Sequence, residues 1–417
     1  MDSFKAQHRT HTTDFTRDRK LSFPLLITLL LQKGVKSIQL LLNEMSLHLG
    51  VSPVSHSAFS QRRMQLKHTA FIELNQKAVV DVMYGDEDYQ TYKGMRVLGI
   101  DGSKIMLPST PSVIGEFGEI SYSNKAKVEG KHAYGMASVM YDVLNRVAID
   151  SHLGKAQDYE VDLALTHLGH TREKDLLLCD RNYPSFRFIS SLYQAQRDFV
   201  IRCSMSSFKQ ARDMLKGKGA DSQLHTLQPH TSKLHSIKQA GLPTVLAVRF
   251  VRVRLNGQFE VLVTSLCDET LYPTADFKEL YRLRWKVETF FVILKTRLGL
   301  ENFTGKSAES VYQDFYSSVY LTGLEAILTE SSQCFLSCKE TRYPQHVNRS
   351  VSFNAIKNKA LDILLAEKQD NNEALAELER LFLTSPTCTR SHRSVPRICP
   401  STRHLLQYAK CSKKSCF

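Results

Sequence analysis

Apolar residues recur at helical spacing through the first 90 residues of the chain. The stretch "VKSIQLLLNEMSLHLG" has this spacing and ends on Gly50, a residue that commonly terminates helices. After the short turn "VSPVSHS", a second helical pattern carries the basic residues Arg62 and Arg63 near its start. A helix, a short turn and a basic helix suit contact with DNA, which predicts a helical DNA-binding domain over residues 1–90. A helical hairpin with a solvated basic face explains the same pattern equally well.

From about residue 91 the pattern changes to short apolar runs that are typical of strands. The runs "MRVLGID", "KDLLLCD" and "DFVIRC" alternate with helical patterns, and "HAYGMASVMYDVLNRVAIDSHL" predicts two strands joined by a turn. Three strands, a helix, a strand, a helix and a strand indicate an α/β core over residues 91–305. Residues 204–266 interrupt this order, and we interpret them as a β-rich insertion with a hairpin at Asn256-Gly257.

The remainder of the chain is predicted to be helical as far as residue 383. A helix over "YRLRWKVETFFVILKTRLGL" closes the core, and a helical C-terminal region follows over residues 306–383. Residues 384–417 form a basic tail that contains several cysteines. No apolar stretch reaches the roughly 20 residues that a membrane-spanning helix needs, so we expect a cytoplasmic protein with no membrane partner.

The net charge of the chain adds information about its binding partner. The chain has 55 Lys and Arg against 42 Asp and Glu, a formal net charge of +13. Such a surplus favours a polyanion, nucleic acid first, although a generally basic protein is the alternative. The sequence shows no Walker-type or dinucleotide-binding loop, and no grouping of its histidines or nine cysteines competes as a metal centre.

Two aspartates, Asp101 and Asp180, each end an apolar run that is expected to be a buried strand. A carboxylate in this position is held at the edge of the sheet, where open α/β folds place ligand sites. Taken singly, each is better explained as a turn aspartate without a functional role.

The predicted helix over residues 281–300 gathers basic residues around one acid. At about 100° per residue, Tyr281, Arg284, Glu288 and Lys295 fall within roughly 60° of one another, beside a separate apolar stripe. Arg284 and Glu288 could form an ion pair, but Lys295 lies too far along the helix to join it. The stripe suits a metal held by the carboxylate, with phosphates on either side. Three carboxylates from two strand ends and a helix would provide the oxygen ligands of paired Mg²⁺ ions for phosphoryl transfer.

The spacing of Tyr281, Arg284, Glu288 and Lys295, Y-x2-R-x3-E-x6-K, resembles the signature of the insertion-sequence-four family of DDE transposases. "GIDGSKIMLP" and "LCDRNYPSF" resemble the blocks around the two aspartates of that family, and "VTSLCDETLYPTADFKELYRLRW" resembles the segment that leads to its glutamate. One departure is Asn182, which stands where the family usually has glycine.

This resemblance implies a catalytic and metal-binding triad of Asp101, Asp180 and Glu288 on an RNase H-like core. The implied cofactor is a pair of Mg²⁺ ions, for which Mn²⁺ can substitute. The residues implied to contact DNA at the transposon end are Tyr281, Arg284, Lys295 and Arg181.

The resemblance further implies cut-and-paste transposition of an insertion sequence. The partners would be the double-stranded DNA of the transposon ends and of the target, held by a homodimer in a synaptic complex. The setting would be the bacterial cytoplasm, in association with the nucleoid. Two alternatives remain: a simple RNase H-like nuclease that cuts without joining, and a catalytically silent DNA-binding regulator derived from a transposase.

Overall fold

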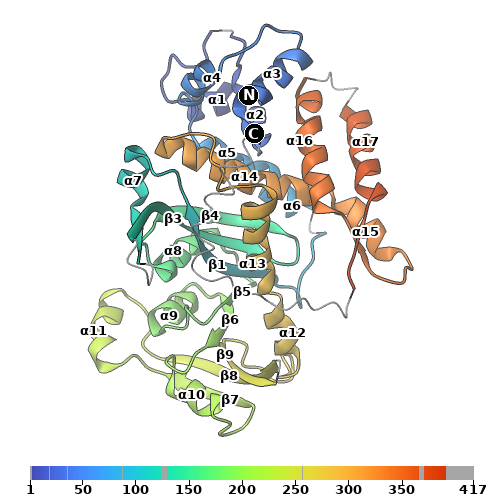
Figure 1. The fold of residues 1–417 in the computed structure, drawn as a ribbon. Coiled ribbons are helices and arrows are strands. Elements are labelled where there is room, and N and C mark those ends of the chain that lie inside the picture. The colour runs from blue at the N-terminus through green and yellow to red at the C-terminus, as the bar shows by residue number, and fades with distance from the viewer. Residues whose placement is uncertain are drawn as a thin grey trace. The chain divides into compact units, whose positions relative to one another are not determined.

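The computed structural model of the chain describes residues 2–17, 19–34, 36–86, 88–123, 129–255, 257–365 and 371–390 (Figure 1). Most of the predicted tail, residues 391–417, therefore lies outside the described part. No described helix is long and apolar enough to cross a membrane. The chain forms two compact units. The first comprises Met1–Gly85, Ile105–Gly135 and Ile293–Phe417, and the second comprises Asp86–Lys104 and Met136–Val292.

A mixed β-sheet, most of whose strands belong to the second unit, confirms the predicted α/β class (Figure 1). Its strand order is β2-β3-β1-β5-β6-β9-β8-β7, with β4 also paired to β3. Strand β5 pairs in parallel with β1 on one side and with β6 on the other. The pairs β6–β9, β9–β8 and β8–β7 are antiparallel. The strand bounds are β1 Arg96–Met106, β2 Glu119–Ser123, β3 Glu129–Asp142, β4 Val147–Lys155, β5 Asp175–Cys179, β6 Asp198–Cys203, β7 Ser222–Leu227, β8 Leu246–Leu255 and β9 Gln258–Thr264.

Strand β5 lies at the centre of the sheet, and a buried ion pair joins its first residue to β1. All five residues of β5 are buried. Arg96 at the start of β1 lies beside Asp175 at the start of β5, and Nε and Nη2 of Arg96 each donate to one carboxylate oxygen at 2.7 Å. Because both side chains are almost fully buried, this two-bond contact fixes the register of β1 against β5.

The segment predicted as a β-rich insertion contains β7, β8 and β9, together with the helices α10 (Lys209–Leu215) and α11 (Thr231–Gln239). Its strands extend the sheet from β6 instead of forming a separate one. The predicted hairpin is confirmed, since β8 and β9 pair as far as Leu255 and Gln258 and Gly257 has a φ of 81°. Asn256 lies outside the described residues.

One buried arginine joins this segment to the chain that follows it. Arg249 on β8 donates from Nη1 to the carbonyl oxygen of Tyr272 at 2.6 Å and from Nη2 to Thr274 Oγ1 at 2.9 Å. Its guanidinium also lies 5.2 Å from the ring centre of Phe277 in helix α12 (Asp276–Arg282). The β-rich segment therefore anchors the loop that leads into α12.

The first unit is mainly helical, as the patterns at both ends of the chain predicted. Ser22, Ser37 and Ser55 cap α2, α3 and α4, each accepting a hydrogen bond from a backbone N–H of the first turn. The helices are α1 Asp2–His8, α2 Phe23–Leu31, α3 Ile38–His48, α4 His56–Arg63, α5 Thr69–Asn75, α6 Asp81–Met83, α7 Pro111–Phe117, α14 Ala308–Leu328, α15 Glu330–Cys338, α16 Arg349–Leu365 and α17 Asn371–Thr384; β10 (Gln345–His346) pairs with β11 (Thr387–Cys388).

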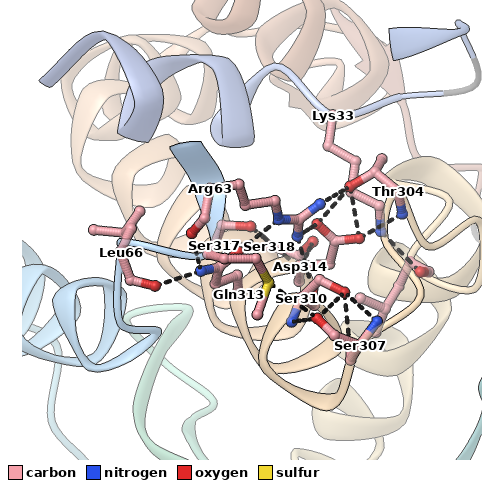
Figure 2. A network of polar contacts seen from close by, with 12 residues as sticks. Lys33, Arg63, Leu66, Thr304, Ser307, Ser310, Gln313, Asp314, Ser317 and Ser318 are labelled. Atoms are coloured by element: carbon pink, nitrogen blue, oxygen red, sulfur yellow. Dashed lines mark hydrogen bonds and ion pairs between the residues drawn. The ribbon is translucent and has the colours of Figure 1, made fainter. Parts of the chain in front are cut away.

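A network of buried polar contacts joins the two terminal regions inside this unit (Figure 2). Arg63, at the end of α4, donates to Asp314 Oδ1 at 2.6 Å, to Gln313 Oε1 at 2.6 Å and to Thr304 Oγ1 at 2.7 Å. Nearby, Lys33 Nζ donates to the carbonyl oxygen of Leu300 at 2.8 Å. Arg63 is 2% exposed and Asp314 is fully buried, so this contact has no competition from water.

Asp314 is held ionised in this network. Its burial alone would raise the pKa, but Arg63, Lys33 and the Thr304 donors outweigh burial and lower the pKa below the ordinary value. Because the folded pKa is depressed, the stabilisation is complete above the ordinary carboxyl pKa. It is lost as the pH falls through the folded value.

We predict that Arg63→Ala lowers the free energy of unfolding by about 3–5 kcal/mol, because it leaves the buried Asp314 charge without its partner. The matched control is Lys77→Ala, which removes an exposed i,i+4 pair with Asp81. This change should lower the free energy of unfolding by less than about 1 kcal/mol. Urea unfolding followed by circular dichroism measures both. Equal losses would contradict a special role for the buried network.

Candidate active site

Asp101 and Asp180 lie side by side at neighbouring strands. The parallel pairing of β1 with β5 ends at Ile100 and Cys179, and each aspartate is the next residue of its strand or loop. The prediction that a strand ends at Asp101 is wrong, since β1 continues to Met106 and buries Ile105 on the way. The pairing of β1 with β5, however, ends just before Asp101 and Asp180. The two carboxylates are therefore adjacent at the margin of this pairing, as expected.

Glu288 is carried by helix α13 (Trp285–Val292), which packs closely on β1. The contact point is Gly99, where an added Cβ would lie 3.1 Å from Val143 Cγ1 and 3.5 Å from Val287 Cβ. Alternate residues of a strand face the same side, so Asp101 points towards this helix as Gly99 does.

Arg284 connects the acids of β1 and α13. Its Nη2 donates to Glu288 Oε1 at 2.6 Å, and its Nη1 lies 3.8 Å from Asp101 Oδ2. The i,i+4 pair expected from the sequence is thus present, and it is largely buried on the arginine side. Among the described residues, Nε and Nη1 of Arg284 are buried without a hydrogen-bond acceptor.

The continuous helix predicted over residues 281–300 is wrong in detail. Helix α12 ends at Arg282, a turn covers Leu283 and Arg284, and α13 is followed by a π-helical turn, Ile293–Arg297. At the junction, backbone N–H groups bond to carbonyls three residues back instead of four, as for Arg284 to Tyr281 at 3.1 Å. The angles expected for an unbroken α-helix therefore do not carry over to Lys295.

The surroundings of Asp101 disfavour its charged form. Burial raises the pKa of Asp101 to about 7; the Arg284 guanidinium opposes the rise, and the carboxylates of Glu160 and Asp180 add to it. Carboxylates gathered in this way repel one another, and a cation placed among them would relieve the repulsion.

Glu160, the first residue of helix α8 (Glu160–Thr166), is a residue of this site that the sequence analysis missed. Its Oε1 accepts hydrogen bonds from the Gly102 backbone N–H at 2.8 Å and from the Tyr183 hydroxyl at 2.9 Å. Gly102 follows Asp101, and Tyr183 follows Asp180 by three residues. Glu160 therefore links the two segments that carry the aspartates.

The turn after Asp180 accommodates the residue that departs from the family pattern. The Asn182 backbone N–H donates to Asp180 Oδ1 at 2.7 Å. Asn182 is not among the residues with positive φ, so the turn forms without the backbone conformation that favours glycine. Arg181, beside it, is exposed.

Tyr281, Arg62, Arg63 and Lys295 occupy different surroundings. Tyr281 is 2% exposed, and its hydroxyl donates to the Cys179 carbonyl at 3.3 Å, which suits positioning of the strand end. Arg62 is half-buried, while Arg63 uses its donors inside the first unit, an arrangement that favours a structural role. Lys295 belongs to that first unit, where burial lowers its pKa.

A second cluster with metal-ligating side chains was also missed. The ligand atoms of Asp150, His152 and His167 lie within 4.8 Å of one another, the one such group found among the described residues. The signal in the sequence was D-x-H, followed 15 residues later by H-x2-H. The acids of Asp101, Asp180 and Glu288 do not form so tight a group.

The chemistry of the main site fits hard divalent cations and phosphate. Its possible metal ligands are carboxylate oxygens only, which Mg²⁺ prefers. The two buried nitrogens of Arg284 that lack an acceptor could each donate to a phosphate oxygen. An α/β unit with such a site defines a class of protein suited to metal-dependent phosphoryl transfer.

The chain belongs to the transposase DDE domain family, whose model matches residues 92–320. The resemblance to insertion-sequence-four transposases is thereby confirmed, and divalent-metal chemistry is general in this family. A similar protein is the transposase InsG for insertion sequence element IS4 of Escherichia coli (strain K12). It is 22% identical over 270 residues, which cover 63% of this chain and 58% of the relative. The chain thus matches less than two thirds of that relative's length.

Among solved structures, the chain is similar to the piggyBac transposase synaptic complex with hairpin DNA, determined by cryo-electron microscopy. The TM-score is 0.41 and the sequence identity is 12%, with 90% of this chain and 80% of that chain covered.

We predict that Glu160→Ala lowers the free energy of unfolding by about 1–3 kcal/mol, because the buried Tyr183 hydroxyl loses its acceptor. Glu160→Gln should lower it less, since an amide oxygen can accept the same bonds. The double variant with Tyr183→Phe should cost less than the sum of the two single changes, by about 0.5 kcal/mol or more. Urea unfolding measures the cycle, and additive losses would show that the contact does not form in solution.

Proposed function

We propose that this chain is the transposase of an insertion sequence and moves its element by cut-and-paste transposition. The observation that carries the proposal is the contact of Arg284 with both Asp101 and Glu288, together with the strand pairing that brings Asp180 level with Asp101. All of these residues lie inside the region matched by the transposase DDE domain.

The proposed core is RNase H-like. The support is the strand order β4-β3-β1-β5-β6, in which β1, β5 and β6 are parallel. The two aspartates lie on or just after the paired central strands β1 and β5, and the glutamate lies on a helix packed against β1. The strands of residues 204–266 then form an insertion between β6 and the helix that carries Glu288.

The proposed cofactor is a pair of Mg²⁺ ions, for which Mn²⁺ substitutes, held by Asp101, Asp180 and Glu288. When bound, such ions supply Lewis-acid activation of the attacking oxygen and stabilisation of the leaving oxygen. The protein's own contribution is to hold the three carboxylates in place. Arg284 orients Glu288 through its hydrogen bond, and Glu160 ties together the segments that bear the two aspartates.

On the strand that is transferred, the proposed reaction has two phosphoryl transfers. In the first, a water oxygen bonds to the phosphorus at the element end, and the 3′ oxygen leaves as a hydroxyl, with the phosphate kept on the flanking DNA. In the second, that 3′-hydroxyl loses its proton and bonds to a target phosphorus, and the target 3′ oxygen leaves. During both transfers, Arg284 would donate to phosphate oxygens from Nε, which has no hydrogen-bond acceptor, and from Nη1, which lies 3.8 Å from Asp101 Oδ2.

The proposed partners are the double-stranded DNA of the element ends and of the target, bound by a homodimer in a synaptic complex. The net charge of +13 supports a polyanionic partner. Tyr281, Arg284, Arg181 and Lys295 remain the proposed end contacts, with Arg62 as a further basic contact. The proposed location is the bacterial cytoplasm, in association with the nucleoid.

The deciding experiment is an assay of DNA cleavage and strand transfer. Purified protein would be incubated with the DNA that flanks its own gene, with Mg²⁺, with Mn²⁺ and with EDTA. Metal-dependent cuts followed by joined products support the transposase. Cuts without joined products favour the simple nuclease, and tight binding without cuts favours the silent DNA-binding regulator.

We predict that Asp101→Asn, Asp180→Asn and Glu288→Gln each reduce cleavage by at least about 1,000-fold, because each removes a ligand charge of the proposed metal site. DNA binding, measured by gel shift, should change by less than about threefold. Cleavage that persists in any one variant would remove that residue from the triad.

We predict that Lys295→Ala weakens binding to element ends and lowers the slope of log K against log salt by about one, the value for one lost phosphate contact. The matched control is Lys359→Ala, since Lys359 already pairs with Glu377 at 2.8 Å and Asp362 at 3.4 Å. Its slope should not change. An unchanged slope for Lys295→Ala would show that this lysine makes no phosphate contact.

A further inference from the structure

Three histidines converge on one carboxylate oxygen in the second unit, and none of them is a residue of the proposed active site. The oxygen is Oδ2 of Asp150 on β4, and the nearest atoms are His167 Nδ1 at 2.7 Å and His152 Nε2 at 3.0 Å. His170 Nε2 follows at 3.9 Å. His167 and His170 bound a 3₁₀ turn that directly continues helix α8.

A hydrogen-bond network without any ion explains part of this arrangement. His167 Nδ1 can donate to Asp150, and the fully buried Ser138 hydroxyl can donate to His167 Nε2 at 2.9 Å. This hydrogen-bond network does not explain the position of the His152 ring. Its Nε2 is buried and forms no hydrogen bond of acceptable geometry, although it points at the same oxygen. A cation at this point would satisfy that nitrogen.

We propose that Asp150, His152, His167 and His170 bind one Zn²⁺ ion. Imidazole nitrogens with one carboxylate oxygen are zinc ligands, and four of them complete its tetrahedral shell. Ligand atoms about 2.1 Å from zinc lie roughly 3.4 Å apart at the tetrahedral angle, and the distances from Asp150 Oδ2 to the nitrogens of His167, His152 and His170, 2.7, 3.0 and 3.9 Å, lie on either side of this value. To reach that separation, the contacts of Asp150 Oδ2 with His167 and His152 would open by about 0.7 and 0.4 Å, and its contact with His170 would shorten by about 0.5 Å.

The surroundings of His167 also suit a zinc ligand. With Nδ1 on the metal, its other nitrogen carries the proton and donates to Ser138 Oγ, as the second nitrogen of a metal-bound histidine usually does. His152 and His170 have side chains that are 36% and 45% exposed, so an ion can enter from solvent. The nitrogen ligands separate this site from the all-carboxylate active site, which prefers Mg²⁺.

The consequence of zinc binding would be structural. The ion would tie β4 to the end of α8, and the first residue of α8 is Glu160, which contacts Gly102 and Tyr183 beside the two aspartates. Zinc would therefore hold α8 in place and raise the stability of the second unit without taking part in phosphoryl transfer.

The test measures zinc in the full-length protein. Protein purified with excess Mg²⁺ and dialysed against trace Zn²⁺ should retain one zinc per chain by mass spectrometry, and Co²⁺ in its place should give the visible absorption of a tetrahedral site. His152→Ala and His170→Ala should each weaken zinc affinity at least about 10-fold. Zinc should also raise the melting temperature of the parent protein but not of these two variants.

The matched control is His235→Ala, which removes an exposed histidine from α11 and should leave zinc affinity unchanged. Glu288→Gln should also bind one zinc, so the zinc proposal can be tested independently of transposase activity. Zinc content no higher than background, or affinity unchanged in both His152→Ala and His170→Ala, would overturn the proposal and leave a hydrogen-bond network alone.

Discussion

The close approach of helix α13 to strand β1 at Gly99 is the constraint on which the candidate active site depends. A side chain at this position would meet Val143 and Val287, so the absence of one sets the distance between helix and sheet. At that distance, Arg284 reaches both Asp101 and Glu288. The relative position of two of the three acids thus follows from packing, before any metal or DNA is present.

Buried arginines hold the rest of the second unit around this contact. Arg96 fixes β1 against β5 through Asp175, and Arg249 fixes the loop that leads into α12. In the first unit Arg63 has the same function for the helices of the two terminal regions. Breaking a buried ion pair is costly because the remaining charge stays out of water, so each arginine favours one arrangement over others.

The sequence contained enough information for the strands, for most helices and for the neighbouring positions of Asp101 and Asp180. An apolar run such as the one before Asp180 predicts a strand from neighbouring residues alone, so tertiary contacts are not needed to recognise it. The partner of Arg63 could not be predicted, because Asp314 lies far along the chain and only tertiary packing unites them. Glu160 begins a helix after a polar loop and carries no local sign of a role. The histidine cluster had a readable spacing, yet the convergence on Asp150 depends on the path of the chain between β4 and α8.

Strands β9, β8 and β7 determine which strand lies at the edge of the sheet beyond β6. Without them, β6 would end the sheet with the apolar residues Phe199, Val200 and Ile201 and with unpaired backbone groups. Such a border recruits strands from other chains. With β9, β8 and β7 added, the outermost strand is β7, which begins Ser-Gln-Leu-His and is only partly buried. These three strands therefore protect the protein from edge-to-edge aggregation.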